Sequence, residues 1–283
     1  MKSNYASPTP LSYFAWLVQA DDNLPLLEAA ISLAQDEDAD LDLQAVLSEV
    51  DRLLAAVRGR IPADAPGVYK LRVLNQYFFN ELGFAGNINN YHDPDNSFVH
   101  RVLQTRRGIP ISLAVVWLEL AQGLGLAARG VSFPGHFLVR VTLSQGQVLI
   151  DPFSGESLSR EELMDRLEPF REQLLGSKDA QHALGQFLHP ASSREIIARM
   201  LRNLKELYRS QTDLNRLLRV QDRLLVLQPE LWTEYRDRGL TRAALGQGQL
   251  AVQDLETYLA HEGQAGDGVA IAERLHALKQ ARQ

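Results

Sequence analysis

Two polar side chains in the middle of the chain have the types and spacing of an acid–base pair. His136 follows Pro134-Gly135, and Asp151 precedes Pro152. Upstream, residues 108–114 have the sequence of a helix start, with a proline suited to the first turn. A nucleophile at a helix N-terminus, a histidine that takes its proton and an aspartate that orients the histidine together perform hydroxyl or thiol catalysis. The order of these residues therefore predicts a triad-like site whose nucleophile has to be found.

The nucleophile position is where the sequence departs from that pattern. The chain has no cysteine among its 283 residues, which excludes thiol nucleophiles, disulfides and thiolate metal sites. Ser112 is the candidate hydroxyl, but a serine in a first helical turn also satisfies free backbone N–H groups. His136, in turn, is either half of a catalytic pair or a hydrogen-bonded histidine at a strand start. Both interpretations stay open for both residues.

The elements that would position these residues are a hairpin and a buried helix. Residues 129–133, 136–143 and 147–150 are predicted strands, and Ser144-Gln145-Gly146 is a turn. That turn makes the last two strands antiparallel neighbours, which brings His136 close to Asp151. The helix predicted from Pro110 to Gln122 is apolar on all sides, so we expect it in a core.

The flanking segments are predicted to be mainly helical. Residues 10–60 show helical periodicity, a helix over 69–82 should end at Gly83, and Ser97 should cap a short helix. Residues 84–97 are rich in Gly, Asn, Asp and Pro and form a predicted loop. Ser159 and Glu162 have the spacing of a capping box.

The C-terminal third has a periodicity of its own. A shift of 34 residues places Asp213 on Gln247 and Leu225 on Leu259, and Pro229 follows the first helical pair. This is the tetratricopeptide period, with a plain helical hairpin bundle as the alternative. One repeat cannot bury its face alone, so two such units need packing on the preceding domain or on a partner.

Composition limits the classes of function. Apolar residues make up 45% and charged residues 23%, as in ordinary globular proteins. The net charge of −6 argues against general nucleic-acid binding. The sequence shows no secretory signal and no apolar run long enough to span a bilayer, so we expect a cytoplasmic protein that does not bind membranes.

Further polar residues near the pair are candidate ligands of a small molecule or ion. Arg140 is two strand residues beyond His136 and is expected on the same side, where it would bind an acidic group or pair with an acidic neighbour. The spacing of His92, Asp93, Asp95 and His100 fits no metal motif, so we expect a loop stabilised by Asx turns and no metal or other cofactor.

Residues 83–151 resemble the SirB-type transglutaminase-like family. The residues that carry the resemblance are Asn87, Tyr91, Asn96-Ser97, Gly108-Ile109-Pro110, Phe133-Pro134-Gly135-His136-Phe137 and Ile150-Asp151-Pro152-Phe153. The resemblance extends over essentially the whole chain. It implies a bacterial, cytoplasmic protein with a helical N-terminal region, a papain-like core and C-terminal tetratricopeptide-like repeats.

The resemblance also implies roles for single residues. His136 and Asp151 would be the histidine and aspartate of the family's triad. Ala114 matches the small residue four positions after the family's cysteine, which puts Pro110, a residue without a nucleophile, in the cysteine position. Asn87, Tyr91 and Asn96 belong to a loop that would wall the cleft, as ligand contacts or as structural residues.

These observations predict an α+β fold: a helical region over 1–65 packed on a transglutaminase-like core with a small antiparallel sheet over 66–190, and tetratricopeptide-like hairpins over 191–283. The function expected first is a non-catalytic adaptor or regulatory protein that binds a peptide or protein through a degenerate cleft and the repeat surface. The alternatives are a serine-dependent hydrolase or acyltransferase using Ser112, His136 and Asp151, and a small-ligand sensor around His136 and Arg140.

Overall fold

The structure is a computed structural model that describes residues 8–21, 24–170, 180–264 and 266–280, with side chains of 180–183 outside the description. The chain divides into two compact units. We call residues 20–197 the core unit, and residues 8–19 with 198–280 the repeat unit. The predicted α+β class with a transglutaminase-like core and C-terminal repeats is confirmed. The predicted boundaries after residues 65 and 190 stay a prediction.

The core unit combines helices with one four-stranded sheet. In chain order its elements are α2 (Leu26–Ser32), the 3₁₀ turn Leu33–Asp36, α3 (Leu43–Arg58), α4 (Gly67–Asn75), the π-helical turn Gln76–Glu81, β1 (Ala85–Gly86), the 3₁₀ turn Pro94–Ser97, α5 (Val99–Thr105), β2 (Arg107–Gly108), α6 (Pro110–Gly123), β3 (Ala127–Val131), β4 (Leu138–Leu143), β5 (Gly146–Ile150), β6 (Ser157–Leu158), α7 (Arg160–Leu167), the 3₁₀ turn Glu168–Phe170 and α9 (Ala180–Phe187). The sheet order is β3-β4-β5-β6, and all its neighbours are antiparallel.

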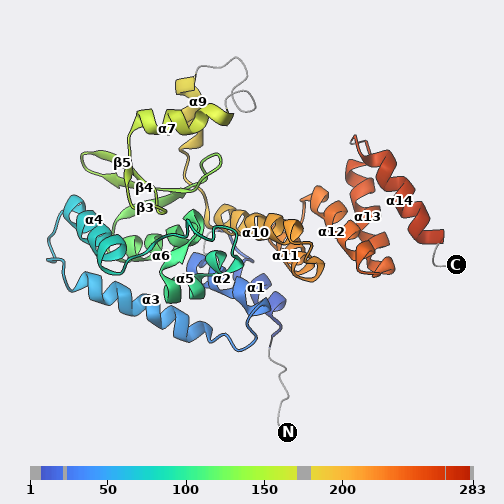
Figure 1. Ribbon diagram of the computed structural model, residues 1–283, viewed down its shortest axis with the longest axis horizontal. Coiled ribbons are helices and arrows are strands. Elements are labelled where there is room, and N and C mark those ends of the chain that lie inside the picture. The colour runs from blue at the N-terminus through green and yellow to red at the C-terminus, as the bar shows by residue number, and fades with distance from the viewer. Residues whose placement is uncertain (1–7, 22–23, 171–179, 265, 281–283) are drawn as a thin grey trace, which may run out of the picture. The chain divides into compact units, whose positions relative to one another are not determined.

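Helix α6 occupies the centre of the core unit, as its all-round apolar sequence predicts. Residues 110–118 are all buried. The helix packs against β3 and β4 on one side and against α2, α3 and α5 on the other (Figure 1). Because one end of α6 belongs to the predicted site, this packing holds the site on a rigid element.

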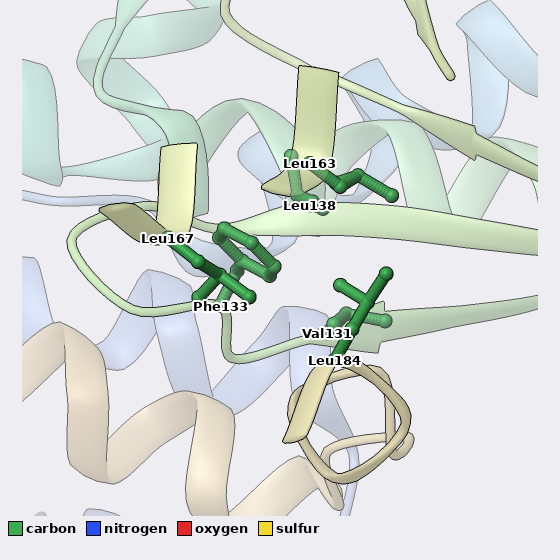
Figure 2. Packing of buried hydrophobic residues seen from close by; sticks show 6 residues of the cluster. All are labelled: Val131, Phe133, Leu138, Leu163, Leu167 and Leu184. Carbon is green, nitrogen blue, oxygen red and sulfur yellow. The ribbon is translucent and has the colours of Figure 1, made fainter. Parts of the chain in front are cut away.

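The second face of the sheet carries its own apolar cluster. Val131, Phe133 and Leu138 from the sheet side meet Leu163 and Leu167 of α7. Leu184 of α9 completes the cluster (Figure 2). Helix α7 begins with the predicted capping box, in which Ser159 N–H donates to Glu162 at 2.7 Å and Glu162 N–H donates to the Ser159 hydroxyl at 3.2 Å. This cluster fixes α7 beside the end of the hairpin where His136 precedes β4 and Asp151 follows β5.

Several predicted boundaries are wrong for local reasons. His136 is not on a strand, because Pro134 and Gly135 form a turn in which His136 N–H donates to Phe133 O at 3.1 Å; Gly135 has φ +65°. The helix predicted to Leu82 turns π-helical at Gln76 and ends, as expected, before Gly83 with φ +72°. Phe98 rather than Ser97 is the N-cap residue of α5. The short parallel pair β1–β2 was not predicted.

The repeat unit consists of α1 (Pro10–Leu17), most of α10 (Ser193–Ser210), α11 (Leu214–Leu227), α12 (Trp232–Ala244), α13 (Gly248–Glu262) and α14 (Gly268–Gln280). The 34-residue period holds in the backbone. Asp213 N–H donates to Tyr208 O, and Gln247 N–H donates to Arg242 O, each five residues back. The residues just before them, Thr212 and Gly246, both have positive φ. The two helical pairs therefore share one turn geometry.

Candidate functional site

His136 and Asp151 are hydrogen-bonded, as the predicted hairpin requires. His136 Nε2 lies 2.8 Å from Asp151 Oδ1. The register that pairs Val139 with Ile150 places the turn before β4 beside the first residue after β5, so the two side chains meet at one end of the hairpin. An ionised carboxylate only accepts hydrogen bonds, so His136 donates from Nε2 in this contact.

The Asp151 carboxylate is buried and has three donors. Its residue is 3% exposed. Besides His136, Arg166 Nη1 donates to Oδ2 at 2.8 Å, and Phe153 N–H donates to Oδ1 at 2.9 Å. Burial opposes ionisation, but the hydrogen bond and charge of His136, with the hydrogen bonds from Arg166 and Phe153 N–H, hold the pKa of Asp151 below its ordinary value. The carboxylate is thus kept ionised to orient the histidine.

Arg166 is a member of this site that the sequence did not point to. It lies in the last turn of α7, and nothing in its neighbouring residues marks it. The Phe153 contact, by contrast, was readable, because Asp and Asn side chains commonly bond the backbone two residues further on. The site is therefore a three-residue polar cluster of His136, Asp151 and Arg166.

At the N-terminus of α6, where a nucleophile would be expected, the side chains are buried and offer no free hydroxyl. Pro110 is the first helical residue and is buried. The Ser112 hydroxyl, fully buried, donates to Asn96 O at 2.6 Å, lies 3.0 Å from Ile109 O, and accepts from Ile109 N–H at 3.2 Å. These are its polar contacts within the described residues, and the His136 ring is not one of them. Ser112 has the geometry of a first-turn structural serine.

The loop over 84–97 is tied down by asparagines. The Asn96 amide, 3% exposed, donates to Asn90 O at 2.6 Å and Tyr91 O at 3.2 Å and accepts from Asn87 Nδ2 at 2.9 Å. Its backbone oxygen accepts from Ile109 N–H as well as from Ser112. All three amide-mediated bonds stay within the loop, so Asn87 and Asn96 shape the loop and attach it to the start of α6.

Tyr91 places this loop beside the polar cluster. Its side chain is exposed, and its ring centroid lies 6.1 Å from that of Phe153. The Phe153 ring in turn lies 6.5 Å from the His136 ring. Gly86 contacts the same phenylalanine, since a Cβ at Gly86 would lie 2.2 Å from the Phe153 ring. An aromatic rim of Tyr91 and Phe153 thus borders His136.

Arg140 is not placed next to His136. Its Nη1 donates to Leu188 O at 2.9 Å, just beyond the end of α9. The expectation that both residues face the same side assumed that His136 continues β4, and the Pro134-Gly135 turn removes that premise. A cation near the last carbonyl groups of a helix is a favourable structural arrangement.

The histidines and aspartates of the 92–100 segment are separated rather than gathered. Asp93 accepts from Asp95 N–H and from Asn90 Nδ2, as an Asx-turn loop predicts. His100 is buried on α5, where burial, assisted by Arg101, lowers its pKa. Within the described residues no group of three His, Asp or Glu side chains could hold a metal ion.

Comparison with known proteins decides the family. The transglutaminase-like superfamily matches residues 44–202, more than half of the chain. The chain belongs to this superfamily. A tetratricopeptide repeat match follows over residues 204–276, so the transglutaminase-like region and the repeats together confirm the resemblance stated above. No solved structure matches.

The relatives are bacterial and cover most of the chain. A UPF0162 protein of Xylella fastidiosa (strain Temecula1) is 40% identical over 240 residues, 84% of each chain. The UPF0162 protein YchA of Escherichia coli K12 is 30% identical over 83% of this chain and 86% of its own. Protein SirB1 of Salmonella typhimurium is 29% identical over 84% and 86%. Within the described residues, no helix is long and apolar enough to cross a membrane.

Proposed function

We propose that this transglutaminase-like protein is a non-catalytic, cytoplasmic adaptor or regulatory protein that binds a peptide or protein through its cleft and its repeats. The observation that carries the proposal is the closed N-terminus of α6. Pro110 stands in the position that the family pattern gives to cysteine, and the nearby Ser112 hydroxyl is buried and bonded to Asn96 O. A serine nucleophile needs an activating base within hydrogen-bond reach, and Ser112 has backbone partners instead.

In this proposal the polar cluster has a structural role that does not require catalysis. Asp151 joins the turn before β4, the loop after β5 and the last turn of α7 through His136, Phe153 and Arg166. A buried carboxylate with three donors holds these segments in one geometry. We assign the cluster the role of shaping the cleft wall that carries the aromatic rim.

The repeat region supports the binding part of the proposal. Tetratricopeptide repeats stack helical pairs into surfaces that generally bind other proteins. Lys205 donates to Glu234 and Asp237 of α12, which couples the neighbouring helical pairs. The small-ligand sensor is less well supported, because Arg140 contacts Leu188 O.

Two experiments on the full chain test the proposal. A fluorophosphonate probe should leave the protein unlabelled, with a known serine hydrolase as positive control; labelling abolished by both Ser112→Ala and His136→Ala would overturn it. In cells, a photo-crosslinking amino acid at the exposed Tyr91 should capture a discrete protein, while the same group at the exposed Gln44 of α3, outside both the cleft and the repeats, serves as the control position. Identical products from both positions would remove the cleft from the proposal.

A further inference from the structure

A groove separate from the polar cluster runs between α4 with its π-helical turn and the β4–β5 hairpin. It encloses about 830 Å³. Neither His136 nor Asp151 lines it. The loop over 154–157 and the tip of the hairpin, at Gln145 and Gly146, also line it. All lining residues belong to the core unit.

One wall of the groove is a helical stripe. Val68, Arg72, Gln76 and Asn80 recur every four residues along α4 and the π-helical turn, so they share one face. A stretch of π-helix inside an α-helix is rare and frequently accompanies a functional site. From Val68 to Asn80 this wall measures roughly 18 Å at about 1.5 Å per residue. An extended peptide of about five residues, at roughly 3.3 Å each, matches that length.

The chemistry of the groove is neutral and amide-rich. Five carboxamide side chains line it: Asn75, Gln76, Asn80, Gln145 and Gln147. A carboxamide offers one donor group and one acceptor side by side, which complements the N–H and C=O of a peptide backbone. Leu71, Phe79 and Val148 add apolar surface between them.

Charge in the groove is balanced between its walls. Arg72 stands on the helical wall and Glu156 on the loop wall. One side chain of each sign gives no net preference for a charged ligand. The groove therefore suits a segment whose central residues are uncharged.

The other wall contributes an unpaired strand edge. Asp151 N–H donates to Glu156 O at 2.9 Å, and Gly155 N–H donates to Asp151 O at 2.7 Å, so the backbone groups of Asp151 point away from β4. The direction of the backbone N–H and C=O groups alternates from one residue to the next along a strand. Gln147 is four residues before Asp151, so its backbone groups also point away from β4. Within the described sheet, β6 pairs only with Leu149 and Ile150 of β5. The edge of β5 at Gln147 therefore has no neighbouring strand among the described residues.

We propose that this groove binds an extended peptide segment of a partner protein, about five residues long and uncharged at its centre, which adds to the β5 edge at Gln147. Asn80 Nδ2 donates to Gln76 Oε1 at 2.9 Å, so the Gln76 amide NH2 and the Asn80 amide oxygen are the groups that hydrogen-bond the peptide backbone from the opposite wall. The apolar side chains of the peptide contact Leu71 and Phe79. Backbone pairing supplies affinity and the apolar surface supplies selectivity, as in other strand additions. This goes beyond the proposed function, on which it rests, by adding a second binding site and the chemistry of the partner segment that it takes.

The loop over 154–157 packs closely against the π-helical turn of the helical wall. Gly155 has φ +81°, and a Cβ there would lie 2.7 Å from the Phe79 ring. Only glycine allows this approach of the loop to the π-helical turn. The same loop bonds Asp151 through Gly155 N–H, so a bound peptide that contacts residues 154–156 also contacts the segment that holds the polar cluster.

The test uses an array of hexapeptides with uncharged, apolar centres, probed with the full-length protein; the peptide that binds most tightly is then measured by fluorescence anisotropy. Gln147→Pro removes the outward N–H of the edge and should weaken binding by about tenfold or more, while Gln147→Ala keeps the backbone and should stay within about threefold. The double variant Gln76→Ala/Asn80→Ala should weaken binding by about tenfold, the loss of one or two hydrogen bonds. Gln44→Ala, an exposed amide on α3 outside the groove, is the matched control and should leave binding unchanged.

The urea midpoint of Gln147→Pro shows whether this variant is folded. Unchanged peptide binding by the folded variant would overturn the strand addition. An array without any binding peptide would overturn the groove as a peptide site. Neither result affects the crosslinks expected from Tyr91, so the adaptor proposal would survive. Fluorophosphonate labelling would instead refute the adaptor proposal while leaving the groove measurement intact.

Discussion

The polar cluster and the N-terminus of α6 are the two halves of what would be one catalytic site, and they differ in how their polar groups are used. In the cluster, the buried Asp151 carboxylate orients His136 and is held ionised by three donors. At α6, a proline occupies the first helical position and Ser112 bonds the backbone of a neighbouring loop. The cluster half therefore has a hydrogen-bonded His–Asp pair, whereas the α6 half has a proline and a serine bonded to backbone groups.

On the proposed function, the difference teaches that a hydrogen-bonded His–Asp pair is not by itself a sign of catalysis. Such a pair also joins segments that are distant in sequence, and here it links the β4 turn, the β5 end and, through Arg166, α7. A nucleophile has no comparable structural use, because a reactive group must be left unbonded and accessible. Comparing the two halves by mutation separates these uses.

The largest effect is expected from Asp151→Ala. The change removes a buried carboxylate and leaves the donors of His136, Arg166 and Phe153 N–H without their acceptor. Breaking a buried ion pair from one side should lower the free energy of unfolding by about 3–5 kcal/mol, measured by urea denaturation. Arg166→Ala, at a more exposed position, is the control and should cost about 1 kcal/mol. A loss of under about 1 kcal/mol for Asp151→Ala would show that the cluster is not structural.

Ser112→Ala should have the second largest effect. The hydroxyl is fully buried and bonds Asn96 O and Ile109 N–H, so its removal leaves these two groups only the 3.2 Å hydrogen bond that they make with each other. We expect the free energy of unfolding to fall by about 0.5–1.5 kcal/mol, the net contribution of lost hydrogen bonds. Ser154→Ala, at an exposed serine, is the control and should stay within about 0.5 kcal/mol. NMR signals of the His136 ring should not move; a clear shift would connect Ser112 to the histidine and reopen the triad.

Acid pH should remove the contribution of the polar cluster to the free energy of unfolding and leave the contribution of Ser112 unchanged. The pKa of Asp151 is lower in the folded protein than its ordinary value, so its stabilising contribution is present above the unfolded pKa of about 3.9 and is lost as pH falls through the folded pKa. Urea midpoints measured between pH 7 and pH 3 should fall more steeply for the wild type than for Asp151→Asn. Parallel curves would contradict the hydrogen-bonded carboxylate, while Ser112→Ala should follow the wild-type slope.

The smallest stability change is expected from Pro110→Cys, which returns a thiol to the family's position. A proline in the first helical turn has no helical hydrogen bond to lose, so the free energy of unfolding should change by about 1 kcal/mol or less. Because the position is buried, iodoacetamide should alkylate the thiol more slowly than free cysteine. Rapid alkylation that His136→Ala abolishes would show that the site is open and that only the nucleophile has been replaced.

Parts of this site could be predicted because they depend on neighbouring residues. The turn at Ser144-Gln145-Gly146 was enough to pair two strands and bring His136 to Asp151. The exact place of His136 was predicted wrongly, since the Pro134-Gly135 turn ends the strand pattern before it. Arg166 could not be predicted, because its contact depends on how α7 docks against the sheet.

The repeats and the groove also differ in whether neighbouring residues in the sequence could predict them. The 34-residue period was visible as a weak chemical match, and the structure expresses it more strongly in the backbone, where Thr212 and Gly246 share a left-handed conformation despite their different side chains. The carboxamides of the groove come from α4 and from the hairpin, far apart in sequence. No local pattern relates them, so the sequence alone did not indicate the groove.

The sequence by itself determined the absence of thiol chemistry, the proline at the first position of α6, the capping box of α7 and the repeat period. Each is a property of composition or of residues within a few positions of one another, whose backbone groups they satisfy directly. The tertiary structure decided that Ser112 bonds Asn96 O, that Arg166 reaches Asp151, and that the β5 edge faces a groove. Those contacts join separate segments, and only burial of the apolar faces of α6 and α7 brings the segments together.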